Sequence, residues 1–200
     1  MRILLFGYGE GVVPAQIEAQ IRQLHEEAWP SGGGRAAADV QEPLHDPVLR
    51  PRALLLVDGS GDGARVLAAL HILSKDIVHQ GVRFTAAGLS TVVTRRGTRR
   101  LGYGRRLATA ARATMAGSGI DLGLFTCERP LRPFYESAGW QYLPGTVLIG
   151  GTPQRPFPSD SPGFGKVTLG AFFSPKARAA AGSFHGARVA VHPGETDRLW

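Results

Sequence analysis

Apolar positions define the elements expected in the first half of the chain. Residues 14–29 carry apolar side chains three or four positions apart, which predicts an amphipathic helix that begins near a proline. Residues 30–51 form a connection that proline and glycine interrupt. The apolar runs 52–59, 64–73 and 82–94 are separated by glycine-containing turns, so they predict three successive strands.

The second half alternates between helical and strand-like patterns. An alanine-rich stretch with a glycine-rich end predicts a helix, and short apolar runs predict strands. A segment that is too polar and proline-rich to be core precedes the last strand. In chain order we expect a helix at 102–119, a strand at 120–127, a short helix at 128–140, a strand at 141–151, a loop at 152–165 and a strand at 166–173.

Three glycines near the N-terminus match a nucleotide-binding signature only in part. Gly7, Gly9 and Gly11 follow a short apolar run, but the third glycine of G-x-G-x-x-G falls at position 12, which is valine. A dinucleotide fold is therefore disfavoured. We predict a flexible glycine turn instead.

Length and composition favour one soluble globular domain over residues 1–200. The apolar share is 43%, and no stretch approaches the roughly 18 consecutive apolar residues of a membrane span. The N-terminus lacks a secretory pattern, and the one cysteine, Cys127, excludes an internal disulfide and a multi-cysteine zinc site. The histidines show no metal-ligand spacing. We expect a cytoplasmic protein with no membrane partner and no metal.

The positive charge is confined to one part of the chain. The net charge is +7, yet eight arginines and no acidic residue lie between Ile77 and Ile120, and the rest of the chain is close to neutral. A surface that binds a long nucleic acid usually spreads its basic residues over a face. A compact anion such as a pyrophosphate is the better match.

The basic stretch "RRLGYGR", residues 99–105, lies where a predicted strand passes into a predicted helix. Backbone N–H groups converge at such a junction, and Gly102 and Gly104 let the main chain approach a phosphate. Arg99, Arg100 and Arg105 can add charge-assisted hydrogen bonds. A solvated basic surface turn is the simpler alternative, but the position at a strand-to-helix junction favours a phosphate site.

Two motifs resemble the GCN5-related N-acetyltransferases, the GNAT family. "RRLGYG" is similar to the R/Q-x-x-G-x-G/A signature that binds the pyrophosphate of acetyl-coenzyme A, and "RPFYESAGW" is similar to the family's tyrosine-bearing helix before a glycine–aromatic turn. The resemblance covers about residues 65–148. It implies an α/β GNAT fold, a mixed twisted sheet flanked by helices, with acetyl-coenzyme A as cosubstrate. The residues implied in coenzyme binding are Val92, Val93, Thr94, Arg99, Arg100, Gly102, Tyr103, Gly104 and Arg105.

A narrower resemblance is to the aminoglycoside 2'-N-acetyltransferases. The chain shares with them the pattern "YxSxGW", a later acidic loop followed by a strand, and a final "TDRLW" with tryptophan shortly after an aspartate. This resemblance implies acetyl transfer to an amino group of an aminoglycoside-type antibiotic, conferring resistance. The 2'-amino position and kasugamycin are the implied candidates.

The resemblance also implies catalytic roles. Tyr135 would donate a proton to the departing thiolate, although it could equally be a partly buried aromatic of an amphipathic helix. Ser90 stands where the narrower family has a glutamate base, and a serine cannot replace a carboxylate at neutral pH. The base therefore stays open among the terminal carboxylate of Trp200, Asp197 and an acid near Asp46.

Acidic residues outside the basic block are candidates for binding a polycationic acceptor. They fall in three loop regions, although acids gather in loops for solvation alone. The residues are Glu42, Asp46, Asp160, Glu195 and Asp197.

Other readings remain open. The acceptor could be a protein N-terminus, a polyamine or another metabolite. Cys127 could carry a covalent acetyl group, although direct transfer is what the family resemblance implies. The arginine patch could instead belong to a nucleic-acid-binding domain, whereas the GNAT reading predicts no nucleic-acid partner. The apolar stretch 167–173 could pair across a homodimer.

Overall fold

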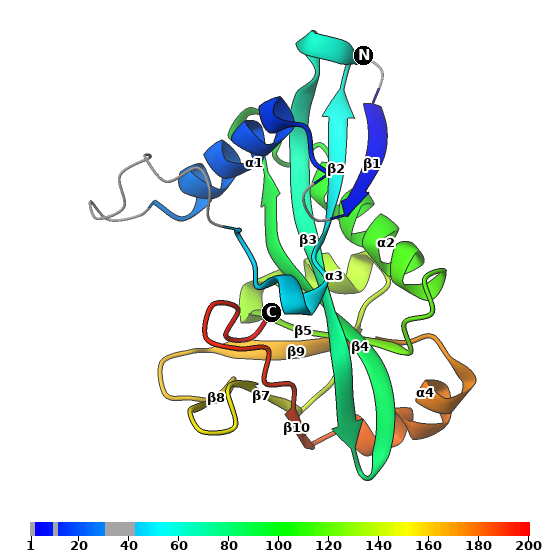
Figure 1. Ribbon diagram of the computed structural model, residues 1–200. Coiled ribbons are helices and arrows are strands. Elements are labelled where there is room, and N and C mark those ends of the chain that lie inside the picture. Colours follow the sequence, from blue (N-terminus) through cyan, green and yellow to red (C-terminus); the bar gives the residue numbers. More distant parts are fainter. Residues whose placement is uncertain (1–2, 10–11, 31–42) are drawn as a thin grey trace.

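The computed structural model describes residues 3–9, 12–30 and 43–200. Within them, seven strands form one mixed sheet in the order β1-β2-β3-β4-β5-β9-β6 (Figure 1). Neighbouring strands are antiparallel except for the β4–β5 pair, which is parallel. The strands are β1 (Ile3–Gly9), β2 (Arg52–Asp58), β3 (Arg65–His79), β4 (Val82–Thr94), β5 (Leu122–Glu128), β6 (Gln141–Tyr142) and β9 (Lys166–Phe172).

Helices cover both faces of this sheet. The helix α1 (Ala15–Ala28) buries Ile17, Ile21 and Leu24 against one face. On the opposite face, α2 (Tyr103–Ala116) buries an apolar stripe, and the short α3 (Arg132–Ser137) packs beside it (Figure 1). The predicted α/β class and the mixed sheet flanked by helices are confirmed. No helix in the described residues is long and apolar enough to cross a membrane.

The N-terminal segment differs from its prediction. Residues Ile3–Gly9 form a strand and not a flexible glycine turn, because their backbone pairs with β2 along its whole length. Gly7 and Gly9 lie opposite Leu54 and Arg52 in this edge pair. Glycine keeps its backbone N–H and C=O, so Gly7 and Gly9 can pair with β2 although they add no side chain to the packing.

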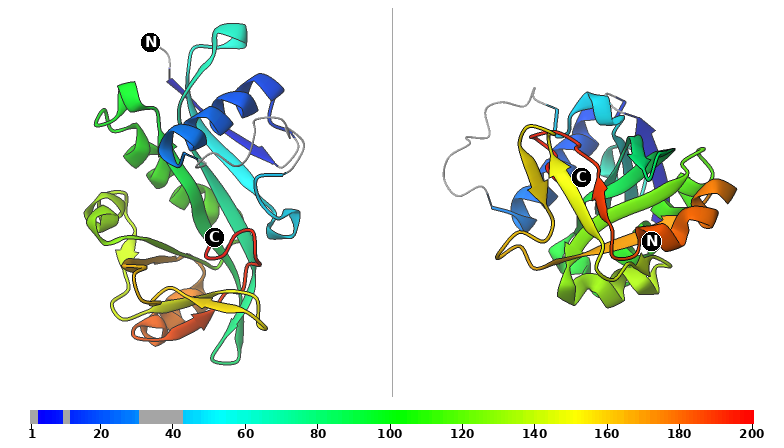
Figure 2. Two further views of the ribbon diagram at one scale, coloured as in Figure 1. Left: turned by 90° about the vertical axis from the view of Figure 1, so that its left-hand side faces the viewer. Right: turned by 90° about the horizontal axis from the view of Figure 1, so that it is seen from below.

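A second, smaller sheet packs at the lower end of the long strands. Its described strands have the order β10-β7-β8, and the right-hand view of Figure 2 shows β7 beside the red C-terminal segment that contains β10. The strand predicted at 141–151 is therefore two strands in two different sheets, and the loop predicted at 152–165 contains β8. The elements are β7 (Val147–Gly151), β8 (Pro156–Pro158), α4 (Pro175–Ala180) and β10 (Arg188–Ala190).

The apolar strand β9 lies inside the main sheet. It pairs with β5 from Lys166 to Phe172 and with β6 at Leu169 and Gly170. These pairings occupy the backbone of its middle residues on both sides, so a dimer contact through β9 would need its side chains or its ends. Homodimerisation stays a prediction.

Candidate active site

The parallel strands β4 and β5 form a fork. They pair only at Ala86–Leu122 and Ala87–Gly123, after which β4 continues along β3 and β5 continues along β9. Beyond that point, the edge of β4 that faces β5 has no strand partner among the described residues. Val92, Val93 and Thr94 lie on this edge. Free backbone groups of this kind can bond an extended ligand in the way a neighbouring strand would.

A β-bulge distorts β4 inside the fork. The register pairs Ser90 with His71 and Val93 with Ala69, so Thr91 and Val92 share one opposing residue on β3. Thr91 has a φ of 49°, in the left-handed region that β-branched residues rarely adopt. Such local strain costs about 1–3 kcal/mol and concentrates at functional sites. The bulge redirects the backbone groups of β4 where the fork opens.

The basic turn lies beyond the end of β4 and opens α2. Gly102 is the residue that caps the helix, with a φ of 82°, and a Cβ there would point into open space. The side chain of Arg95 anchors the turn, because its Nε donates a hydrogen bond to the carbonyl of Val66 at 2.8 Å. Arg99, Arg100 and Arg105 are exposed. The N–H groups of the first helical turn, an unobstructed glycine and exposed guanidinium groups together suit a pyrophosphate.

Gly104 ties this turn to the fork. A Cβ on Gly104 would approach the hydroxyl oxygen of Thr94 to 3.0 Å and the ring of Phe134 to 3.3 Å. The end of β4, the start of α2 and the helix α3 therefore meet at this glycine. Tyr103 is buried in the core under the turn, so its side chain supports the turn from below.

Tyr135 on α3 is buried beside the fork. Its ring meets Phe125 edge-on, with ring centroids 4.9 Å apart, and Phe134 at 4.8 Å. Burial raises the pKa of the Tyr135 phenol above its ordinary range, with a further contribution from Cys127. The phenol is therefore protonated at neutral pH, as a proton donor must be. Burial likewise raises the pKa of the Cys127 thiol to about 11, which disfavours a covalent route through its thiolate.

The C-terminal segment lies on the other side of the fork, held by the small sheet. The carbonyl of Arg198 accepts a hydrogen bond from the N–H of Gly151 at 2.8 Å. A Cβ on Gly150 would lie only 1.8 Å from the same carbonyl, so glycine is required for this close approach. Lys75 on β3 donates to the carbonyl of His192 at 2.6 Å. These contacts fix the segment that carries Asp197 and Trp200.

Asp197 joins this segment to the residues just before β2. Its Oδ1 lies 2.6 Å from Nδ1 of His45, and its Oδ2 accepts the backbone N–H of Asp46 at 2.9 Å. The side chains of His45 and Asp197 are 3% and 6% exposed. Sequence reasoning missed His45, because it lies 152 positions from its carboxylate and no local motif marks it.

His71 packs against His45, and His25 packs against His71. The ring of His71 meets that of His45 edge-on at 4.6 Å, and Nδ1 of His71 lies 2.8 Å from the hydroxyl of Thr91 in the bulge. His25 on α1 meets His71 at 5.9 Å. Burial is the main cause that lowers the pKa of His25 to about 4 and that of His71 well below its usual range, and His45 adds to both shifts. His25 and His71 are therefore neutral at pH 7.

Trp200 lies at the base of the fork, where β4 and β5 separate. Its indole lies against Gly88 in β4. The indole also packs against two apolar clusters, one that contains Tyr135 and one that contains Leu199. Ser90, two residues after Gly88, is buried opposite His71. Ser90 and Trp200 thus lie at β4, and Asp197 and Asp46 are connected to it through His45 and His71.

The other predicted acids lie apart from this group. Asp160 is exposed and forms an ion pair with Arg188 on β10, with Oδ2 at 2.8 Å from the guanidinium. Glu195 is exposed and pairs with Arg155. Glu42 lies outside the described residues. No cluster of three or more metal-ligating side chains occurs in the part of the chain that the structure describes.

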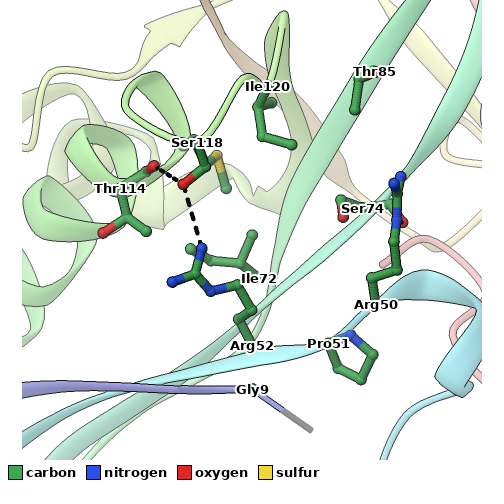
Figure 3. Close-up of a pocket in the computed structure, with 11 residues that line it drawn as sticks. Gly9, Arg50, Pro51, Arg52, Ile72, Ser74, Thr85, Thr114, Ser118 and Ile120 are labelled. Atoms are coloured by element: carbon green, nitrogen blue, oxygen red, sulfur yellow. Dashed lines mark hydrogen bonds between the residues drawn. The ribbon is translucent and has the colours of Figure 1, made fainter.

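A separate groove of about 400 Å³ lies between β2, the start of β4 and the end of α2 (Figure 3). Arg50 and Arg52 lie along it, and Arg52 donates to the hydroxyl of Ser118 at 3.3 Å. The groove is lined by Thr85, which lies near the start of β4 and precedes the residues at which the fork opens. This groove is therefore distinct from the site around Thr91.

The family of the chain follows from residues 15–143, which match the family model described as "Acetyltransferase (GNAT) domain". The chain belongs to the GNAT acetyltransferase family. It is accordingly an N-acetyltransferase, and acetyl-coenzyme A is the acetyl donor that GNAT membership implies. A search of curated protein sequences finds no significant match.

Solved structures with the same fold include several GNAT proteins. An acyl-CoA N-acyltransferase from Pseudomonas aeruginosa is 16% identical with a TM-score of 0.55, over 84% of this chain and 99% of that one. Escherichia coli ElaA is 15% identical with a TM-score of 0.56, over 84% and 99%. An aminoglycoside 6'-N-acetyltransferase complexed with coenzyme A is 16% identical with a TM-score of 0.54, over 88% and 98%. At these identities the likeness concerns the fold.

Proposed function

We propose that this GNAT enzyme transfers the acetyl group of acetyl-coenzyme A to a primary amine of an aminoglycoside-type antibiotic and so confers resistance to it. The 2'-amino group is the preferred position, and kasugamycin is a candidate acceptor. The observation that carries the proposal is the contact of the C-terminal segment with the fork: the indole of Trp200 lies on Gly88 of β4, and Asp197 in the same segment accepts a hydrogen bond from the N–H of Asp46.

The donor side of the mechanism rests on β4, the basic turn and α3. The coenzyme supplies an activated acetyl thioester. Val92, Val93 and Thr94 would hold its pantetheine arm along the free edge of β4, and the Gly102 turn with its arginines would hold the pyrophosphate. A backbone N–H of the bulged segment would polarise the carbonyl oxygen. Tyr135, protonated because it is buried, would supply the proton for the thiolate.

The acceptor side rests on acids and a rigid wall. A polycationic sugar needs carboxylates close to its ammonium groups. The carboxylate of Asp46 is partly exposed and is the proposed contact, and Asp197 holds the backbone of Asp46 in place through a hydrogen bond to its N–H. The indole of Trp200 offers a flat apolar surface against which a sugar ring can stack. Asp160 and Glu42 remain proposed outer contacts for a large acceptor.

Relatives of the same fold support more than one acceptor class. The aminoglycoside 6'-N-acetyltransferase supports an antibiotic acceptor. A NatC complex bound to a Gag peptide and coenzyme A, 15% identical with a TM-score of 0.53, supports a peptide acceptor. An amine other than an aminoglycoside is therefore the second candidate. The partly exposed carboxylate of Asp46 favours an acceptor that carries several ammonium groups over a peptide end that carries one.

The test is a thiol-release assay with acetyl-coenzyme A against kasugamycin, 2'-amino aminoglycosides, polyamines and short peptides. Mass spectrometry of the products should show the gain of one acetyl group on an antibiotic. Acetylation of peptides or polyamines alone would replace the proposed acceptor. Duplex DNA retention with a steep salt dependence, together with no binding of acetyl-coenzyme A, would favour a nucleic-acid partner instead.

A further inference from the structure

His45 is a buried histidine with one satisfied and one unsatisfied nitrogen. Nδ1 lies 2.6 Å from the carboxylate of Asp197, whereas Nε2 is buried and has no hydrogen-bond partner among the described residues. Leaving a buried polar atom without a partner is energetically unfavourable, because the atom has lost its hydrogen bonds to water. A structure that places such an atom beside the fork of a transferase suggests that a substrate group pairs with it.

Asp197 determines which nitrogen of His45 carries the hydrogen. An ionised carboxylate can only accept hydrogen bonds, so Nδ1 of His45 carries a hydrogen, and in the neutral imidazole the lone pair is then on Nε2. The second oxygen of Asp197 is occupied by the N–H of Asp46, which fixes the plane of the carboxylate and with it the orientation of the ring. A carboxylate in this position also stabilises the imidazolium that forms when Nε2 accepts a proton.

We infer that His45 is the general base of the acceptor site and that Asp197 is its positioning residue. Nε2 of His45 accepts a proton from the ammonium group of the acceptor, in the place that a glutamate would take and that Ser90 cannot. This inference rests on the proposed acetyl transfer to an amine. It does not depend on which amine is the natural acceptor.

The titratable and charged groups that face His45 come from β3, α1, the residues before β2 and the C-terminal segment. His71 from β3 and His25 from α1 are buried and neutral at pH 7 because their pKa values are lowered. Asp197 and Asp46 are the nearest carboxylates, and the ammonium of Lys75 lies close enough to interact with Asp46. Because the neighbouring imidazoles stay neutral, a proton that reaches His45 is balanced by Asp197.

The protons and bonds of the transfer balance as follows. The ammonium gives one proton to Nε2 of His45, and its nitrogen then forms the new C–N bond while the C–S bond breaks. The thiolate takes the phenolic proton of Tyr135. The nitrogen of the new amide loses a second proton, which restores the phenol of Tyr135. His45 then releases to water the proton that it took from the ammonium group. One amide, one thiol and one released proton result.

The kinetic test uses His45→Asn, because the amide nitrogen of asparagine can keep the hydrogen bond to Asp197 but cannot accept a proton. With any amine that the wild-type enzyme acetylates, kcat should fall about 10²- to 10⁴-fold, while the KM for acetyl-coenzyme A should change less than twofold. The rise of kcat/KM with pH that reports the base should disappear. In the Asp197→Asn variant, the rise of kcat/KM should move to a different pH, and kcat should fall less than it does in His45→Asn.

A matched control is His79→Asn, which removes a different buried histidine, one that lies on β3. The ring of His79 stacks on Phe184, and its Nε2 lies 3.1 Å from the Ser183 carbonyl, so this substitution should lower stability without changing the pH profile. A His45→Asn enzyme that keeps the wild-type pH limb and kcat would overturn the inference.

A second measurement separates this inference from the choice of acceptor. Nitrogen-15 NMR of the histidine rings at pH 7 should show His45 with its hydrogen on Nδ1, identified by the signals missing from His45→Asn. The Asp197→Asn variant should alter this tautomer. A hydrogen on Nε2 in the wild-type protein would overturn the role of His45 even if an antibiotic is acetylated. Failure to acetylate antibiotics, with the expected tautomer present, would count only against the proposed acceptor.

Discussion

The indole of Trp200 lies directly on the backbone of Gly88. A Cβ at Gly88 would come within 2.6 Å of two indole carbons and within 2.8 Å of the carbonyl oxygen of Leu124 on β5. Gly88 follows Ala87, the last residue of β4 that pairs with β5. The indole is therefore wedged at the base of the fork, and the absence of a side chain at position 88 makes room for it.

Gly88→Ala should displace Trp200. The added methyl group has backbone on one side and a held indole on the other, so overpacking should cost about 1–3 kcal/mol and lower Tm by several degrees. Acetyl transfer should fall more than binding of acetyl-coenzyme A, because the displaced ring belongs to the acceptor side. Gly7→Ala is the control, since nothing lies within 4 Å of a Cβ at that strand position. Thermal unfolding and steady-state kinetics measure both effects.

Gly102→Glu should abolish binding of acetyl-coenzyme A. A Cβ at Gly102 meets no atom within 4 Å, so the carboxylate would occupy the space proposed for the pyrophosphate and repel it. The φ of 82° also strains any side chain. Gly119→Glu is a matched control, because Gly119 has a φ of 75° with open space around it at the other end of α2. Calorimetric titration should show binding lost in the first variant and kept in the second; binding by both would remove the phosphate role of the turn.

Tyr135→Phe should lower kcat with little effect on the KM for acetyl-coenzyme A. The raised pKa keeps the phenol protonated well above neutral pH, so the wild-type enzyme should show no loss of rate from this group as pH rises to 9. Phenylalanine keeps the edge-on contact with Phe125 and removes only the hydroxyl group that would donate the proton. Tyr142→Phe, a half-buried tyrosine stacked with Arg132, serves as the control. Equal rates in both variants would exclude the phenol as the acid.

Sequence patterns were sufficient for those parts of the fold that depend on local periodicity. The helix ahead of the first long strand, the junction at Gly102 and the tyrosine-bearing helix all lie where the pattern predicts them. The strands β6, β7 and β8 have two, five and three residues, which is too short for a clear periodic pattern. They form strands because their backbones pair with segments that are distant or not recognisable in the sequence. The pair His45–Asp197 is beyond sequence reasoning for the same reason, because it joins residues 152 positions apart.

Buried histidines should make the protein sensitive to mild acid. The pKa of His25 is lowered from 6.5 to about 4, mainly by burial, so between these values the unfolded chain binds a proton that the folded chain excludes. The stability that the folded protein gains from keeping His25 neutral is therefore fully present above pH 6.5, and it is lost as pH falls towards 4. Linkage gives a loss of about 2 kcal/mol in the free energy of unfolding between pH 7.5 and 5 from this group. His71, whose pKa is lowered in the same direction, adds to it.

His25→Leu isolates this contribution. Leucine fills a similar volume, and the one polar interaction that it removes is a weak contact of the His25 ring with the backbone of Thr91. Urea unfolding at pH 7.5 and pH 5 should show a smaller acid-induced loss in the variant than in the wild-type protein, by about 2 kcal/mol. The remaining loss in the variant should reflect His71 and other groups. If wild type and variant lose the same stability on acidification, His25 is charged in the folded protein, and the neutral imidazole environment proposed around His45 must be abandoned.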